Sequence, residues 1–517
     1  MSNSTDRRHF LGASLCTLLA ACGGGNINSA NAQAITDPGP AEQKNIDLAV
    51  AQLDTLVASI MASTGVPGVA VAVVQGDRKL YAKGFGVRDI RNASPVDADT
   101  VFPLASVSKS VAATVVAREV TAGHVRWNQP VSELLAWFAL SDPVVTKQVT
   151  IGDMLSHRSG LPDHAGDQLE DMGYSQREVL ERLRLMPLDG FRTKYEYTNF
   201  GYTAGSLAGA AKSGVDWAAL SEQAIYQPLG MTRTSSRFAD FAGRSNRTVG
   251  HSKYGSSWAI DTQRMPDAQA PAASVTSSAN DMAKWLSMLI GEGSFGGRRI
   301  LSASALNPAI SAQMQNSPAG NGQSAGYYGY GFNVNTMSSG RKSYGHSGAF
   351  SLGAATAFKV LPATGLGIVI LTNGYPIGVP EIISAQFFDL VEHGAVQNDY
   401  PKLFQPLFAG LVAPEGSLVG VPRPASPKPA QALQSYAGSY RNDYHGPLLV
   451  EVTGDSLLLT LGRTPLRLQL AHWDGDVFTF ALNSENAPPG TISKASFAAD
   501  RVTLEFFDAN GLGTFVR

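Results

Sequence analysis

Apolar residues follow a helical and then an alternating pattern near the start of the chain. An apolar residue recurs every three to four positions between residues 41 and 63, which predicts a helix. Residues 69–74 and 80–86 are two β-prone runs separated by a Gly-Asp pair, which predicts a β-hairpin. From residue 41 on, the chain is therefore predicted to begin with a helix followed by two antiparallel strands.

The same elements recur in reverse order near residue 380. Strands are predicted at 353–360 and 366–371, and a helix at 381–392. Between the two units lies a helix-rich middle, with helix caps predicted at Thr150 and at Ser175, the latter paired with Glu178. This pattern predicts an α/β (α+β) fold in which both chain ends build one antiparallel sheet, flanked by helices and with a helical subdomain inserted.

Prolines mark a boundary after this unit. Seven of them fall between residues 401 and 429, which predicts a stiff linker over 396–430. Residues 431–517 contain short alternating runs with Gly-Asp and Asp-Gly turns, which predicts a small antiparallel β-barrel or sandwich. We therefore expect an export segment at 1–40, described next, a main domain at 41–395, the linker, and a C-terminal β-domain.

The first 40 residues have the features of a targeting segment. Arg7-Arg8 precedes a weakly apolar run that ends in Leu19-Ala20-Ala21-Cys22, and this resembles a twin-arginine signal joined to a lipoprotein box. Ordinary cleavage after Ala32 or Ala34 is the alternative. Both predict export to the periplasm or outer membrane, and lipidation of Cys22 would add a membrane tether.

Composition narrows the function classes. The 517 residues are 44% hydrophobic and 16% charged, with a net charge of −2 and no basic block, so a nucleic-acid partner is not expected. The two cysteines, Cys16 and Cys22, both precede the main domain, so no disulfide is expected in the mature fold. The histidines show no ligand-like spacing, and we expect neither a metal nor another cofactor.

Ser106 and Lys109 are the first candidates for chemistry. They stand at i and i+3 at the start of a small, apolar helical run, so the amine can reach the hydroxyl. Burial favours the neutral amine, which can take a proton from serine, and the helix N-terminus favours an oxyanion. An ordinary N-cap serine is the competing interpretation. A second Ser-x-x-Lys, at Ser339 and Lys342, lies in a Gly/Ser-rich run and is predicted to be a loop.

Two later motifs supply the groups that a serine–lysine pair lacks. Tyr197-Thr198-Asn199 places a phenol and an amide two residues apart, and His346-Ser347-Gly348 precedes a predicted strand pair. The order Ser-x-x-Lys, Tyr-x-Asn and His-Ser-Gly resembles the serine β-lactamase and penicillin-binding-protein superfamily, in particular its class C-like branch. The resemblance covers about residues 42–395. It implies a β-lactamase/transpeptidase-like fold. The C-terminal domain separately resembles the small β-domain often appended to such hydrolases, which in related aminopeptidases limits access to the cleft.

The resemblance implies a role for each motif residue. Ser106 would be acylated, Lys109 and Tyr197 would share general-base work, and Asn199 would hold the substrate amide and Lys109. His346 and Ser347 would contact a substrate carboxylate or carbonyl beside Gly348. The backbone N–H groups of Ser106 and Ala349 would form the oxyanion hole.

His346 departs from the class C β-lactamases, which carry lysine there. Histidine is mostly neutral at pH 7, and the His-x-Gly form resembles DD-carboxypeptidases, D-aminopeptidases and esterases. We therefore expect an exported serine hydrolase acting on a small ester or peptide, with DD-carboxypeptidase, D-aminopeptidase or weak β-lactamase activity as alternatives. The sequence says nothing about oligomeric state.

Two rival interpretations remain open. Gly345-His346-Ser347-Gly348-Ala349 nearly spells the nucleophile elbow of an α/β-hydrolase, which would make Ser347 the nucleophile and requires a helix after it. An inactive envelope protein that only binds peptidoglycan or a partner is the non-enzymatic rival.

Overall fold

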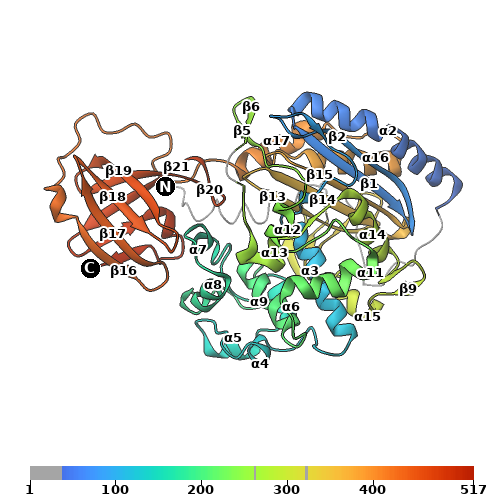
Figure 1. The fold of residues 1–517 in the computed structure, drawn as a ribbon, viewed down its shortest axis with the longest axis horizontal. Coiled ribbons are helices and arrows are strands. Elements are labelled where there is room, and N and C mark those ends of the chain that lie inside the picture. The colour runs from blue at the N-terminus through green and yellow to red at the C-terminus, as the bar shows by residue number, and fades with distance from the viewer. Residues whose placement is uncertain (1–37, 261–262, 321–323) are drawn as a thin grey trace.

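The structure is a computed structural model that describes residues 38–260, 263–320 and 324–517. Its larger part combines a sheet with helices, and a separate barrel lies to one side of it (Figure 1). The predicted export signal and its Cys22 lie outside the described residues.

The centre of the larger part is a nine-stranded sheet whose strands pair antiparallel. β1, from the start of the chain, pairs with β15, so both chain ends build the sheet as predicted. The strands, in spatial order, are β10 (Met314–Ser317), β11 (Gly326–Tyr328), β12 (Asn333–Thr336), β13 (Lys342–Phe350), β14 (Ala354–Leu361), β15 (Leu366–Thr372), β1 (Gly68–Gln75), β2 (Arg78–Asp89) and β3 (Ser94–Pro95).

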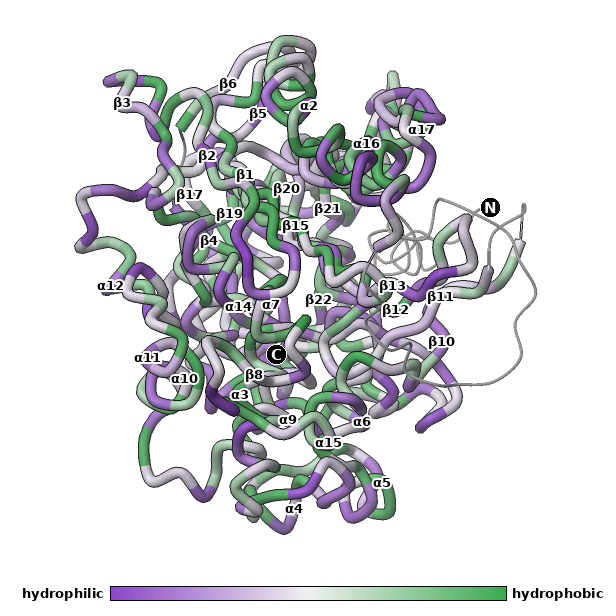
Figure 2. Tube along the Cα trace, turned by 90° about the vertical axis from the view of Figure 1, so that its right-hand side faces the viewer, coloured by the Kyte–Doolittle hydropathy of each residue, from purple (hydrophilic) through white to green (hydrophobic). Residues whose placement is uncertain are grey.

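Successive side chains along β1 point to opposite faces of the sheet and pack into two different hydrophobic cores. Val69, Val71 and Val73 face the helices α2 (Pro40–Thr64) and α16 (Val379–His393), whereas Ala70 and Ala72 pack into the core on the other side of the sheet. The strand is buried on both faces because helices cover both. In Figure 2, α2 and α16 alternate between green and purple, as expected for helices with one face on the sheet.

Helix α2 is long and apolar enough, by length and composition, to cross a membrane. In this fold its apolar side is instead used internally, since Ile46, Ala49, Leu53, Val57 and Ile60 are buried in the core shared with α16. It is a structural helix of the main domain.

The inserted middle is mainly helical and lies on the opposite face of the sheet from α2. The predicted caps are present: Thr150 with Asp153 and Ser175 with Glu178 each form a reciprocal capping box. The helices of this part are α3 (Val107–Thr121), α4 (Val131–Leu134), α5 (Pro143–Gln148), α6 (Ile151–Leu155), α7 (Asp167–Asp171), α8 (Gln176–Arg182), α9 (Asn199–Ala210), α10 (Trp217–Ser221), α11 (Gln227–Leu229), α12 (Phe238–Ala242), α13 (Ala270–Ala273), α14 (Ala279–Ile290) and α15 (Ala303–Leu306). Short strand pairs join β4 (Phe102–Pro103) to β7 (Thr276–Ser277), β5 (Ser252–Tyr254) to β6 (Ser257–Ala259), and β8 (Ser294–Phe295) to β9 (Arg298–Arg299).

The segment predicted as a linker begins with a helix. α17 (Tyr400–Leu411) packs Tyr400, Phe404 and Phe408 onto the core beneath α16. Pro401 is tolerated because it occupies the first turn, where its missing N–H has no intrahelical partner. The expectation of a linker over all of 396–430 is therefore wrong for its first third, which belongs to the main domain.

The C-terminal part is a closed barrel of eight antiparallel strands, which confirms the predicted class. Closure leaves no free sheet edge, and Leu448, Leu459 and Phe515 are among the residues that fill the interior. The strands are β16 (Gly438–Asn442), β17 (Gly446–Thr453), β18 (Ser456–Leu461), β19 (Leu466–Asp474), β20 (Val477–Ser484), β21 (Ala487–Ala498), β22 (Arg501–Leu504) and β23 (Thr514–Val516).

Candidate active site

Ser106 stands at the N-terminus of α3, at the wall of a cleft. The preceding Ala105 has φ of 46°, a left-handed conformation that few non-glycine residues adopt, and the sharp turn there leads into the helix. Most of α3 is buried, so its first turn is held firmly. The fold therefore presents the Ser106 hydroxyl from a rigid element.

Lys109 lies one turn further along α3 and is fully buried. Its Nζ is 3.1 Å from Ser106 Oγ, 2.7 Å from Asn199 Oδ1 and 3.2 Å from the carbonyl oxygen of Ala272. These three acceptors match the three donors of an ammonium group. The amine is thus fixed against the serine hydroxyl.

Tyr197 and Asn199 come from the start of α9, on either side of its extended N-cap residue Thr198. The Tyr197 hydroxyl lies 2.8 Å from Ser106 Oγ, and Lys109 Nζ lies 4.6 Å from the centre of the Tyr197 ring. Ser106 Oγ therefore has both a phenol and an amine within hydrogen-bond reach. The two motifs, about 90 positions apart in the sequence, meet at one oxygen atom.

Gly348 explains how β13 reaches the nucleophile. A Cβ atom built on Gly348 would overlap the carbonyl oxygen of Leu104 and lie 2.8 Å from the backbone nitrogen of Ser106. Only glycine allows the strand to approach the helix terminus this closely. The next residue, Ala349, borders the same cleft as Ser106.

His346 also borders the cleft, but both of its ring nitrogens are engaged. Nδ1 lies 2.5 Å from the carbonyl oxygen of Ser347 and therefore carries the proton, which leaves Nε2 to accept from the Tyr328 hydroxyl at 2.8 Å. Burial, helped by the charge of Lys109, lowers the pKa of His346 to about 3. The ring is neutral and both of its nitrogens are engaged, and the expected contact of His346 with a substrate carboxylate or carbonyl stays a prediction.

The Ser347 side chain points to the other face of the sheet. It neighbours Glu381 of α16, whereas His346 neighbours Tyr328 on the cleft side, as alternation along a strand requires. Ser347 also lies inside β13, and a turn leads from that strand into β14, where a nucleophile elbow needs a helix. The α/β-hydrolase interpretation therefore has no structural support, and Ser347 can meet a substrate only through its backbone.

Two contributors carried no sequence motif. Asp167 Oδ2 accepts from Asn199 Nδ2 and bonds to His164 Nδ1, each at 2.8 Å. His157 is buried in the helical part; its Nδ1 accepts from the backbone N–H of Thr198, and burial lowers its pKa. Both residues support the turn that carries Tyr197 and Asn199.

The barrel supplies one wall of the cleft, including Tyr444, Phe506, Phe507 and Leu512. Four carboxylates also line it, namely Asp163, Asp167, Glu415 and Glu485. Arg264 is the one Lys or Arg side chain among the described residues of the lining, and it is paired with Glu170 and Glu485. In the part of the chain that the structure describes, no group of three or more His, Cys, Asp or Glu residues could hold a metal ion.

The family model described as Beta-lactamase matches residues 53–384, a span that includes Ser106, Lys109, Tyr197 and Asn199. The chain belongs to the β-lactamase family. A second model, a domain of unknown function (DUF3471), matches residues 422–515, which contain the barrel.

Individual relatives agree with this membership. The chain is 27% identical over 476 residues to an unguisins hydrolase of Aspergillus violaceofuscus, covering 84% of this chain and 82% of that protein. It is 28% identical to penicillin-binding protein 4 of Amycolatopsis lactamdurans over 74% of this chain and 95% of the relative. An octameric penicillin-binding protein homologue from Pyrococcus abyssi shares the fold, with a TM-score of 0.57 and 20% identity over 90% of this chain and all of that one.

Proposed function

We propose that this member of the β-lactamase family is an exported serine hydrolase that cleaves an ester or amide bond through an acyl-enzyme on Ser106. The observation that carries the proposal is the geometry at Ser106 Oγ, with Tyr197 at 2.8 Å and Lys109 at 3.1 Å. A serine hydroxyl needs an adjacent base to attack a carbonyl, and both neighbours lie within hydrogen-bond reach of it. Lys109 as the neutral amine, or Tyr197 as the phenolate, can accept its proton.

In the proposed reaction the Ser106 oxygen attacks the carbonyl carbon and its proton passes to the Lys109–Tyr197 pair. The negative charge that forms on the carbonyl oxygen is stabilised by the backbone N–H groups of Ser106 and Ala349. The same pair then protonates the leaving alcohol or amine as its bond to carbon breaks. Water then attacks the acyl carbonyl and gives a proton to the same pair. The bond between the acyl carbon and Ser106 Oγ breaks, the carboxylic acid leaves, and the pair returns the proton to Ser106.

The cleft favours substrates without a carboxylate at the reacting end. His346 is neutral and fully bonded, Arg264 is already paired with two acids, and four carboxylates line the walls. The aromatic barrel wall suits an apolar acyl or leaving group. We therefore place neutral aryl or alkyl esters and uncharged peptide amides ahead of β-lactams and peptides with a free C-terminal carboxylate, and the unguisins hydrolase relative supports hydrolysis as the reaction class.

The test is adduct mapping with a fluorophosphonate, with Ser106→Ala as the control. We expect one labelled peptide containing Ser106, loss of label in the variant, and faster turnover of a neutral aryl ester than of a chromogenic cephalosporin. An adduct on Ser347 would restore the α/β-hydrolase interpretation. Absence of any adduct in the folded protein would favour the inactive binding protein.

A further inference from the structure

The turn between β20 and β21 is one of the parts of the barrel that border the cleft. Its residues Glu485 and Asn486 line the same cleft as Ser106. The turn contacts both the sheet and the helical part of the main domain, so the barrel does more than cover the cleft.

Glu485 binds the sheet side of this junction. Its two carboxylate oxygens accept hydrogen bonds from the backbone N–H groups of Ser351, at 3.0 Å, and Leu352, at 3.2 Å. These residues form the turn that connects β13 to β14, and Ser351 is only two positions beyond Ala349. A charged carboxylate on two adjacent amides is a strong restraint on that turn.

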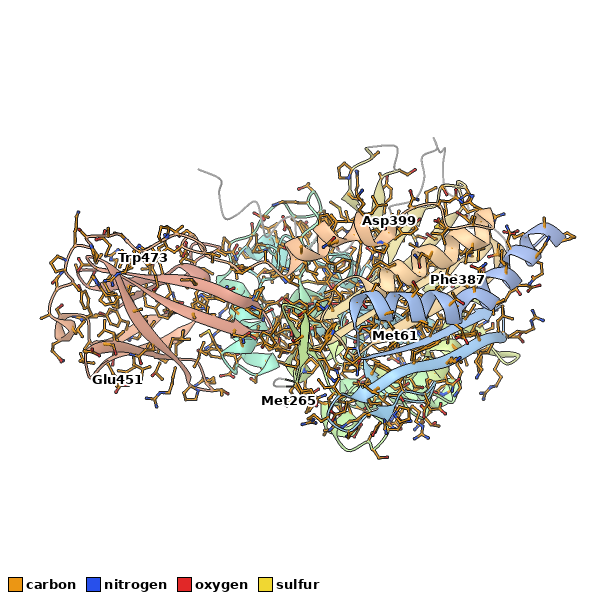
Figure 3. All side chains as sticks on the ribbon, turned by 90° about the horizontal axis from the view of Figure 1, so that it is seen from above. Met61, Met265, Phe387, Asp399, Glu451 and Trp473 are labelled. Carbon is orange, nitrogen blue, oxygen red and sulfur yellow. The ribbon has the colours of Figure 1, made fainter. Side chains whose placement is uncertain are left out.

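Arg264 holds Glu485 in place. Its guanidinium lies 3.0 Å from Glu485 and 2.7 Å from Glu170 of α7, and it stacks 4.7 Å from the centre of the Phe350 ring. All three charged side chains are about nine-tenths buried. A pair removed from water is screened far less than a surface pair, and losing one partner leaves the other buried without its counter-charge. Figure 3 shows Met265, the neighbour of Arg264, at the junction between barrel and main domain.

The same barrel turn binds the helical side. Ser484 Oγ donates to Asp171 at 2.7 Å, and Asn486 Nδ2 donates to the backbone carbonyl of Asp167 at 3.1 Å. Asp167 in turn orients Asn199. One turn of the barrel therefore contacts both the turn that follows the strand of Ala349 and helix α7, whose Asp167 supports the base.

We propose that Glu485, paired with Arg264, is a positioning residue for the oxyanion hole: by fixing the Ser351–Leu352 turn it sets the backbone N–H of Ala349 relative to Ser106. The inference rests on the proposed function and deepens it. The hydrolase site is then complete only when the barrel is docked, because one of its two oxyanion donors depends on a barrel side chain.

The test compares Glu485→Gln with the matched control Glu451→Gln, which changes an exposed barrel residue at a distance from the junction (Figure 3). Substrates are an aryl ester and its thionoester, in which sulfur, a weaker hydrogen-bond acceptor, replaces the carbonyl oxygen. For Glu485→Gln we expect kcat on the ester to fall about 10- to 100-fold with KM within about twofold. We also expect the ester-to-thionoester ratio of kcat/KM to fall about tenfold, because a misplaced N–H costs the oxygen substrate more.

A purely structural role for Glu485 would lower Tm without changing the ester-to-thionoester ratio, and that result overturns the proposal. Glu485→Asp and Arg264→Lys keep the charges and provide the same readout if Glu485→Gln does not fold. Wild-type protein that labels on Ser106 while Glu485→Gln shows unchanged kcat refutes only this inference. Wild-type protein that does not label refutes the proposed function itself.

Discussion

The carboxylate of Asp167 accepts a hydrogen bond from Asn199 Nδ2, and this bond turns Asn199 Oδ1 towards Lys109 Nζ, 2.7 Å away. An amide has one accepting and one donating end, so fixing the donor fixes which end meets the amine. Lys109 in turn contacts Ser106. A side chain that lies outside all three sequence motifs therefore orients the base through an intermediate amide.

Removing this support should slow the reaction without removing any reacting group. We expect Asp167→Ala to lower kcat about 10- to 100-fold, because Asn199 loses the bond that orients it. Steady-state kinetics on a neutral aryl ester measure the effect. The control is Asp189→Ala, which removes a partly exposed carboxylate paired with Lys194. Equal kcat values for the two variants would contradict the role assigned to Asp167.

Tyr197 is expected to take part in proton transfer directly. Tyr197→Phe keeps the ring beside Lys109 but removes the hydroxyl at 2.8 Å from Ser106 Oγ, so kcat should fall about 10²- to 10⁴-fold. Fluorophosphonate labelling rates and kcat should fall together, since acylation needs the same group.

Tyr202→Phe is the matched control for the tyrosine. Its hydroxyl donates to the backbone carbonyl of Lys109 at 2.6 Å and contacts no atom of Ser106 among the described hydrogen bonds. Its loss should cost about 1 kcal/mol of stability and change kcat less than tenfold. A Tyr202 variant as slow as the Tyr197 variant would show that packing around Lys109, and not the Tyr197 hydroxyl, limits the rate.

Local patterns predicted the parts of the fold that depend on neighbouring residues. The helix before β1, the hairpin of β1 and β2, the helix cap at Thr150 and the capping box at Ser175 follow from periodicity and short spacings, and the structure contains each of them. The contact of Ser106 with Lys109 is equally local, since both lie on one helical turn. The approach of Tyr197 to Ser106 is not local, and only the order of the motifs indicated it.

The features that sequence patterns failed to predict depend on tertiary contacts. Helix α17 forms among prolines because its aromatic residues find a core to pack on, and tertiary packing overrides weak propensity. The Ser347 side chain was expected at the substrate, but strand register places it under α16. Asp167 and Glu485 belong to no motif, and their roles arise from contacts between segments that lie far apart in the chain.

Gly348 should be the least replaceable residue of the His-Ser-Gly motif. In Gly348→Ala the new methyl group would meet the backbone of Leu104 and Ser106, and backbone cannot rotate away as a flexible side chain can. We expect a loss of about 1–3 kcal/mol in stability and at least about a 100-fold loss in kcat, since β13 must move away from the nucleophile. Gly410→Ala, in α17 with no atom within 4 Å of the added methyl, is the control and should leave both quantities nearly unchanged. A fully active Gly348→Ala variant would show that β13 does not need this approach.

The free energy of unfolding should depend on pH through Glu381, whose carboxyl group is buried in α16 next to Ser347. Burial raises the pKa of Glu381 from 4.5 to about 7, and the neighbouring Ser347 hydroxyl only partly offsets this. Between pH 4.5 and 7 the carboxyl group of Glu381 loses its proton in the unfolded chain but keeps it in the folded protein. The contribution of Glu381 to the free energy of unfolding therefore declines with rising pH, by up to about 3 kcal/mol, and is constant above pH 7. Glu381→Gln cannot ionise. The difference in unfolding free energy between variant and wild type, from urea titrations at pH 5, 6, 7 and 8, should therefore increase in favour of the variant up to pH 7. Glu392→Gln, on the same helix but partly exposed, is the matched control. If the difference in unfolding free energy between Glu381→Gln and wild type did not change with pH, this carboxyl group would be ionised in the folded protein throughout the range.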